Sequence, residues 1–126
     1  QNLNSENGIT IASYGISLKY ENMKTIKTKE LKNMIENDEA IVIEVLEEEE
    51  YNKSHIKGAL NIPLKKISYE SEKRFNKDDT IVVYCSDAEC TASPTAAKKL
   101  EDSGFTDIYN YKSEKKAWKD AGLLMK

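Results

Sequence analysis

The sequence has no apolar run near the ~20 residues that a helix needs to cross a bilayer, so we expect no membrane span. It also lacks an excess of positive charge, because its 19 Lys and Arg residues are outnumbered by 22 Asp and Glu residues, which gives a formal charge of −3. Such a balance offers a polyanion no general attraction, so nucleic acid is not an expected partner. The length of 126 residues corresponds to one domain of ordinary size.

Arginine, cysteine and histidine are all scarce. Arg74 is the single arginine, so an anion site would have to use lysines or backbone N–H groups. Cys85, Cys90 and the single His55 are too few for a structural zinc site, and two cysteines cannot form a disulfide framework. We therefore expect neither a metal nor a cofactor. The two cysteines are still close enough in sequence for a local, reversible disulfide.

The first part of the chain differs in composition from the rest. It begins at Gln1 without a methionine, and residues 1–8 are polar and show no periodicity. Residues 9–20 contain β-type side chains interrupted by a glycine, which allows an extra strand. We therefore expect a partly disordered extension over residues 1–21 and a compact domain over 22–126. This start and the cysteine pair fit an exported, periplasmic bacterial protein slightly better than a cytoplasmic one.

Four segments have the pattern of β-strands. Residues 40–46 and 80–85 are nearly continuous runs of apolar, largely β-branched side chains, which is typical of parallel strands covered on both faces. Shorter candidates are residues 59–62 and 106–111. Within the segment 80–85, Tyr84 and Cys85 are adjacent and should face opposite sides of the sheet.

Helical patterns alternate with these strands. Thr28, Ser93 and Ser113 are good N-caps for three helices, and the acidic run that starts at Glu47 is best interpreted as the solvated first turn of another. Residues 63–77 show no clear pattern and are expected to form a loop. The alternation of strands and helices predicts an α/β domain with a parallel sheet.

Cys85 stands at the carboxyl end of a predicted central strand, and the N-terminus of the next predicted helix follows it in the chain. In α/β sheets this edge collects reactive groups, because loop N–H groups and the positive end of the next helix meet there. Such surroundings lower the pKa of a thiol, and the thiolate is the nucleophile. The position fits equally well an inert cysteine that ends a core strand.

Several segments resemble, in order and spacing, the single-domain rhodanese-like proteins, and the similarity extends from about residue 26 to residue 123. The most specific part is Glu50-Tyr51 followed by the HIKGA stretch and Asn61-Ile62-Pro63. The others are the strand segment TIVVYC, the segment AAKKLEDSGFTDIYNY and the C-terminal AWKDAGL.

This resemblance implies a three-layer α/β fold, with a mostly parallel central sheet and helices on both faces. It implies a sulfurtransferase in which Cys85 carries sulfur as a persulfide, taken from a donor such as polysulfide or thiosulfate and passed to a thiol or to cyanide. His55 would serve in packing and hydrogen bonding. The backbone N–H groups of the following loop would hold the persulfide: Ser86, Asp87, Ala88, Glu89, Cys90 and Thr91.

The sequence also departs from the family pattern. Glu44 and Leu46 stand where Asp and Arg are common, so a stabilising ion pair should be lost. The loop after Cys85 lacks the Arg and Gly of the usual Cys-Arg-x-Gly sequence. The Gly-Gly pair usual before the last helix is replaced around Lys112 and Ser113, so this turn must differ as well.

Acidic residues in the loop bear on the choice of substrate. Asp87 and Glu89 put two negative charges beside any anion held there, and each contact costs on the order of 1 kcal/mol. Thiosulfate, a small dianion, should be a poor donor unless Lys98 or Lys99 turns inward. Polysulfide or a protein persulfide should suffer less.

Cys90 leaves three functions open. It can resolve a persulfide on Cys85, which would release sulfide and leave a disulfide for a thioredoxin-like partner to reduce. Alternatively, it fills the apolar underside of the loop. The candidate functions are therefore a sulfurtransferase or sulfur carrier, a catalytically weak rhodanese-like binding module, and a dithiol redox protein that uses both cysteines.

Overall fold

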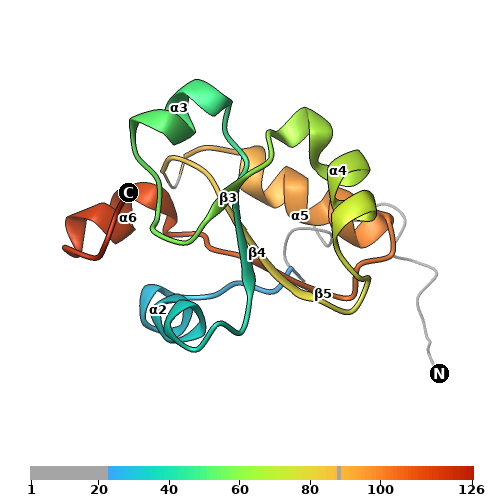
Figure 1. The fold of residues 1–126 in the computed structure, drawn as a ribbon, viewed down its shortest axis with the longest axis horizontal. Helices are drawn as coiled ribbons and strands as arrows, with labels where there is room; N and C mark the ends of the chain where they lie inside the picture. The colour runs from blue at the N-terminus through green and yellow to red at the C-terminus, as the bar shows by residue number, and fades with distance from the viewer. Residues whose placement is uncertain (1–22, 88) are drawn as a thin grey trace, which may run out of the picture.

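The sheet of the domain has four parallel strands in the order β3-β2-β4-β5 (Figure 1). The computed structural model describes residues 23–87 and 89–126, so the expected extension over 1–21, its extra strand and Ala88 lie outside the described residues. The longest predicted strands, at 40–46 and 80–85, provide the two central positions, as expected. The strands are β2 (Ile41–Glu44), β3 (Leu60–Asn61), β4 (Thr80–Tyr84) and β5 (Asp107–Asn110).

Helices cover both faces of this sheet, which confirms the three-layer α/β architecture. On one face, α4 and α5 pack with Ile67 and Leu100 against Ile81 and Val83. The other face is covered by α2 and α6 (Figure 1). Leu31 of α2 and Trp118 of α6 join a second cluster there. The helices are α2 (Thr28–Glu36), α3 (Glu48–Lys53), α4 (Ile67–Arg74), α5 (Ala92–Asp102) and α6 (Glu114–Asp120), with a 3-10 turn, η2 (Leu64–Lys66), before α4.

The prediction of a loop over residues 63–77 is wrong, because η2 and α4 occupy most of it. Only Ile67 and Ser71 of α4 are buried, one turn apart, and one of them is polar. The helix therefore lacks the apolar stripe that would mark it in the sequence. It forms because tertiary packing of Ile67 against the sheet stabilises it.

Side chains of β4 alternate between the two cores. Ile81, Val83 and Cys85 belong to the cluster beneath α4 and α5, whereas Val82 and Tyr84 belong to the cluster beneath α2 and α6. The prediction that Tyr84 and Cys85 face opposite sides is thus confirmed. This alternation directs Cys85 toward the N-terminal end of α5.

In two helices the N-cap lies earlier in the chain than expected. The N-cap of α2 is Lys27 rather than Thr28, and the N-cap of α5 is Thr91 rather than Ser93. Both expected hydroxyl groups have partners from distant parts of the chain, since Thr28 bonds to the Tyr111 hydroxyl at 2.6 Å and Ser93 bonds to a carboxylate of α6. Ser113 is the N-cap of α6, as predicted. Among the described residues, no helix has the length and apolarity required to cross a membrane.

Candidate active-site loop

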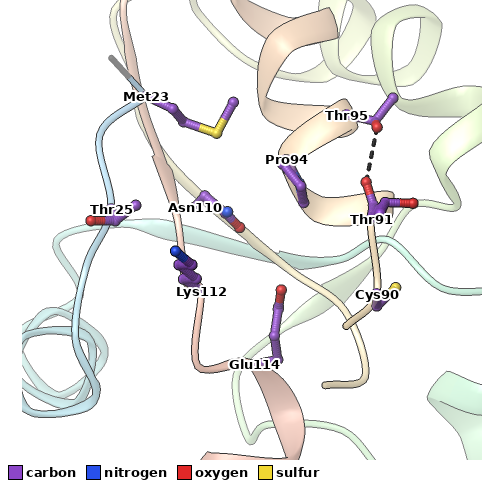
Figure 2. A pocket seen from close by; sticks show the side chains of 9 residues that line it. All are labelled: Met23, Thr25, Cys90, Thr91, Pro94, Thr95, Asn110, Lys112 and Glu114. Atoms are coloured by element: carbon purple, nitrogen blue, oxygen red, sulfur yellow. Dashed lines mark hydrogen bonds between the residues drawn. The ribbon is translucent and has the colours of Figure 1, made fainter. Parts of the chain in front are cut away.

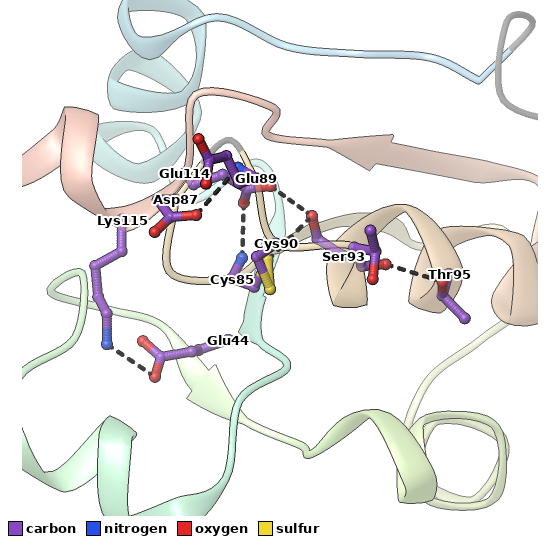
Figure 3. Close-up of a disulfide and its surroundings, with 10 residues drawn as sticks. Glu44, Cys85, Asp87, Glu89, Cys90, Ser93, Thr95, Glu114 and Lys115 are labelled. Carbon is purple, nitrogen blue, oxygen red and sulfur yellow. Dashed lines mark hydrogen bonds and ion pairs between the residues drawn. A yellow bond between two sulfur atoms is a disulfide. The ribbon is translucent and has the colours of Figure 1, made fainter.

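Cys85 and Cys90 form a disulfide that closes the loop between β4 and α5 (Figure 3). Cys85 directly follows the last residue of β4, and Cys90 lies two residues before α5 begins. Their Cα atoms are 6.4 Å apart, inside the ~4.4–6.8 Å range of disulfides. The loop curls back as the hypothesis of a resolving Cys90 requires.

The two cysteines differ in exposure. Cys85 is completely buried in the core under α5, whereas Cys90 is half-buried at the edge of the same cluster. Cys90 also lines a cavity of about 390 Å³, together with Pro94, Lys112 and Glu114 among others (Figure 2). Of the two cysteines, Cys90 is therefore the more accessible to a reagent from solution.

Asp87 shapes the loop between the two cysteines. Its carboxylate accepts the Glu89 N–H at 3.0 Å, and its carbonyl accepts the Cys90 N–H at 3.1 Å. A side chain that bonds to the amide two residues ahead is a common way for Asp to stabilise a turn. Two loop amides are therefore engaged within the loop itself.

Other polar contacts join the loop to the last helix and to α5. The Lys115 and Lys116 N–H groups donate to the carbonyls of Cys85 and Ser86, at 3.0 and 2.9 Å. Thr91, at the other end of the loop, accepts the Thr95 hydroxyl through its carbonyl. The structure thus places the loop predicted as the site beside the start of the last helix. The turn before this helix, around Lys112 and Ser113, was noted in the sequence only for its missing glycine pair.

No sequence motif indicates Glu114 directly, although its carboxylate accepts a hydrogen bond from Cys85. Its side chain is only 2% exposed, and one carboxylate oxygen accepts the Cys85 N–H at 2.7 Å. The other accepts the Ser93 hydroxyl at 2.7 Å, and the Ser93 oxygen lies 3.8 Å from the Cys85 sulfur (Figure 3). The carboxylate is therefore joined to Cys85 both directly and through Ser93.

Burial has a strong effect on the acidity of this group. Loss of solvation raises the pKa of Glu114 to about 7. The hydrogen bonds from Cys85 and Ser93 lower the pKa in part, and the negative charge of Asp87 raises it further. The disulfide therefore lies beside a carboxyl group that titrates near neutrality.

The backbone at Glu114 explains how the side chain reaches the loop. Its φ angle is +69°, in the left-handed region that residues with a Cβ rarely adopt. The residue follows Lys112 and Ser113, where the family has two glycines, so the turn keeps an unusual backbone without a glycine. The only sequence signal was this missing glycine pair.

Two of the loop N–H groups expected to hold a persulfide, and the N–H of Cys85 itself, bond to protein oxygens in the disulfide form. The Cys85 N–H donates to Glu114, and the Glu89 and Cys90 N–H groups donate to Asp87. In the disulfide form, the acceptors of these three N–H groups are therefore carboxylate or carbonyl oxygens of the protein. An incoming anion would have to compete with Glu114 for the Cys85 N–H.

The ion pair that the sequence was expected to lose is replaced by another. Glu44 is fully buried at the end of β2, and its carboxylate lies 3.1 Å from the Lys115 ammonium of α6. The Tyr84 hydroxyl donates to Glu44 at 2.8 Å and accepts the Ile56 N–H at 3.1 Å. Burial and the neighbouring Glu44 charge raise the pKa of Tyr84 strongly. This network fixes α6, and with it Glu114.

Lys98 of α5 does not neutralise the acidic loop. The Lys98 ammonium forms an ion pair with Asp102 one turn further along the helix, so this side chain does not turn inward. His55 packs away from the loop, with its ring stacked on Tyr51 at a centroid distance of 3.7 Å. Its Nδ1 bonds to the Tyr51 carbonyl at 2.9 Å, which confirms the predicted packing role.

The model of the rhodanese-like domain matches residues 27–121 of this chain, which include the sheet, both helical layers and the cysteine loop. The chain belongs to the rhodanese-like domain family.

Relatives carry the rhodanese-like domain in proteins of different length. The chain is 26% identical to the thiosulfate sulfurtransferase GlpE of Coxiella burnetii over 76% of its own length and 87% of the relative. It is 32% identical to the HTH-type transcriptional regulator Rv0324 of Mycobacterium tuberculosis over 78% of its length, but spans only 42% of that protein. The crystal structure of BH2092 from Bacillus halodurans superposes with a TM-score of 0.76 at 25% identity, covering 94% of this chain and 86% of the other.

Proposed function

We propose that this rhodanese-like domain takes up sulfane sulfur as a persulfide on Cys85 and that Cys90 then resolves the persulfide, with release of sulfide. The observation that carries this proposal is the bond between Cys85 and Cys90, which shows that the loop allows their sulfur atoms to meet. The relatives named as thiosulfate sulfurtransferases support the first step. The second step depends on Cys90 of this chain.

The sequence of bonds is as follows. Cys85 is buried in the disulfide form, so the proposal requires that reduction of the disulfide frees the loop and exposes its sulfur. The Cys85 thiolate then attacks the terminal sulfane sulfur of the donor, whose S–S bond breaks as the remainder leaves as a thiolate or a shorter polysulfide. The Cys90 thiolate then attacks the Cys85 sulfur, and the terminal sulfur leaves as hydrosulfide. The two thiols are oxidised by two electrons to a disulfide, while the sulfane sulfur is reduced to sulfide. A dithiol reductant of the thioredoxin class regenerates both thiols and becomes a disulfide itself.

Charges around the loop favour particular donors. Asp87 lies within the loop, Glu114 occupies the Cys85 N–H, and Lys98 is paired with Asp102. A dianion such as thiosulfate would have to approach these carboxylates without an arginine in the loop. We therefore propose polysulfide or a protein persulfide as the preferred donor.

The test follows sulfur on the reduced protein after brief treatment with polysulfide. Free thiols and persulfides are trapped by alkylation and located by mass spectrometry, and released sulfide is measured in parallel. The native chain should give the Cys85–Cys90 disulfide and sulfide. Cys90→Ser should retain a persulfide on Cys85 and release little sulfide, whereas Cys85→Ser should take up none.

Ser86→Ala is the matched control, because it keeps the backbone groups of the loop and, among the described residues, the Ser86 hydroxyl has no hydrogen-bond partner. This variant should behave like the native chain. A native chain that accumulates persulfide on Cys85 while Cys90 stays reduced would show that Cys90 does not resolve it.

Transfer of the persulfide sulfur to cyanide or to another thiol is the second candidate, favoured by the relatives named as sulfurtransferases. A cyanide assay with thiosulfate and with polysulfide distinguishes the two. Activity that requires Cys85 and increases in Cys90→Ser indicates direct transfer in competition with resolution. Turnover with a dithiol reductant that requires both cysteines indicates the resolving route.

A further inference from the structure

Glu114 and Ser93 are buried polar residues that none of the steps above uses. Both side chains are nearly or completely buried, at 2% and 0% exposure, and they bond to each other at 2.7 Å. The Ser93 oxygen is 3.8 Å from the Cys85 sulfur, which is contact distance for a hydroxyl and a sulfur atom. The three groups therefore form an unbroken line from carboxyl to hydroxyl to sulfur (Figure 3).

Cys85 needs a proton source when the disulfide is reduced. An external thiolate can approach the half-buried Cys90 but not the fully buried Cys85, so Cys85 is the sulfur that must leave. It leaves into a site without contact to solvent, beside a carboxyl group. A thiolate there would lack hydration and would face the charge of Glu114 if that group were ionised.

We propose that Ser93 and Glu114 form a proton relay that protonates Cys85 as the disulfide is reduced. This inference rests on the proposed function, in which the disulfide must be reduced in every cycle. Ser93 is the group in contact with the reacting sulfur, and Glu114 is a positioning residue that holds the proton and acts through Ser93.

The step balances as follows. The thiolate of a dithiol reductant attacks the Cys90 sulfur, and the bond between Cys90 and Cys85 breaks as a mixed disulfide forms on Cys90. The Ser93 hydroxyl donates its proton to the Cys85 sulfur, and the carboxylic acid of Glu114 donates its proton to the Ser93 oxygen. The negative charge moves from the reductant to Glu114, which later recovers a proton from water. The second thiol of the reductant then releases Cys90.

Glu114 is suited to this role at neutral pH, because burial raises its pKa to about 7. Asp87, on the cysteine loop, is the charged neighbour that raises this pKa further. Lys112 lines the same cavity from the turn before α6, and Tyr111 at the end of β5 has a pKa raised by its own burial. Lys115 and Lys116 of α6 have other partners, since the first binds Glu44 and the second binds Asp120.

The test measures how fast dithiothreitol reduces the disulfide of the whole chain between pH 5.5 and 8.5. Samples are quenched by alkylation, and each rate is divided by the thiolate fraction of dithiothreitol at that pH. For the native chain, this corrected rate should fall about tenfold as pH rises through about 7, because Glu114 loses the proton that it supplies. General acids contribute ~10² or more to many reactions, and a thiolate needs less help than poorer leaving groups.

The variants separate a relay from a structural effect. Glu114→Gln and Ser93→Ala should both lose the inflection and should react about tenfold more slowly than the native chain at pH 6. Asp87→Asn is the matched control, since it removes a carboxylate from the same site but not from the relay. It should keep the inflection and move it to lower pH, because the Asp87 charge raises the pKa of Glu114.

Several outcomes would overturn the proposal. An inflection that survives in Glu114→Gln assigns the titration to another group, and an unchanged profile in Ser93→Ala removes the hydroxyl from the path. A slowing that is equal at every pH shows that Glu114 only supports the loop. The assay contains no sulfur donor, so its failure is distinguishable from failure of the polysulfide experiment above, and Ser93→Ala tests the relay without changing the unusual backbone at Glu114.

Discussion

Replacement of Glu114 by glutamine should abolish a large pH dependence of stability. Burial raises the pKa of Glu114 from 4.5 to about 7. The folded protein therefore binds this proton more tightly than the unfolded chain does. The stability linked to it is complete below about pH 4.5 and is lost as pH rises to about 7. At 1.36 kcal/mol per pKa unit, the free energy of unfolding should fall by about 3 kcal/mol across this range and then stay level.

Glu114→Gln retains the size and most of the hydrogen bonds of the side chain but cannot ionise. We expect the free energy of unfolding of this variant to be nearly constant between pH 4.5 and 7. The native chain loses stability over the same range. The difference in stability between variant and native chain should therefore shift in favour of the variant by up to about 3 kcal/mol between pH 4.5 and pH 7. Urea denaturation of the oxidised protein at a series of pH values measures this directly.

Asp87→Asn serves as the control in the same titration. Because the Asp87 charge contributes to the raised pKa of Glu114, this variant should show a smaller fall in stability over the same range. The reasoning is refuted if the native chain shows no fall between pH 5 and 7, or if Glu114→Gln shows the same fall as the native chain.

Three further predictions concern charged side chains elsewhere in the domain. Lys115→Met should lower the free energy of unfolding by about 3–5 kcal/mol in the same urea experiment, because it leaves the buried carboxylate of Glu44 uncompensated. Lys116→Met, at an exposed ion pair, should leave the free energy of unfolding almost unchanged. Asp87→Asn should raise kcat/KM for thiosulfate by about fivefold, which a cyanide assay measures, and an unchanged value would remove repulsion as the barrier. Lys24→Met should raise the lowered pKa of Asp107 toward its ordinary 3.8, as followed by NMR, and a pKa that stays low would assign the shift to other contacts.

Local patterns in the sequence determined most of the scaffold. The apolar runs at 40–46 and 80–85 form the central strands. Their apolar, largely β-branched side chains point to both faces of the strand, and a central strand in a sheet covered by helices buries both faces. The position of Cys85 after β4 follows from the end of that run, and Ser113 is the N-cap position of α6, as predicted, although its side chain makes no capping hydrogen bond. Each of these features depends on residues close together in the chain.

Tertiary structure decided which polar groups meet. Glu114 bonds to Cys85 across 29 positions of sequence, and Lys115 pairs with Glu44 across 71. Neither contact has a periodic signal, because each depends on how α6 docks against the sheet and on a single left-handed residue at its start. Burial then sets the acidity of Glu114, since the solvent that would hold its pKa near 4.5 is displaced by the packed core. The sequence thus determined where the cysteine stands, while the packing of distant elements determined the carboxyl group beside it.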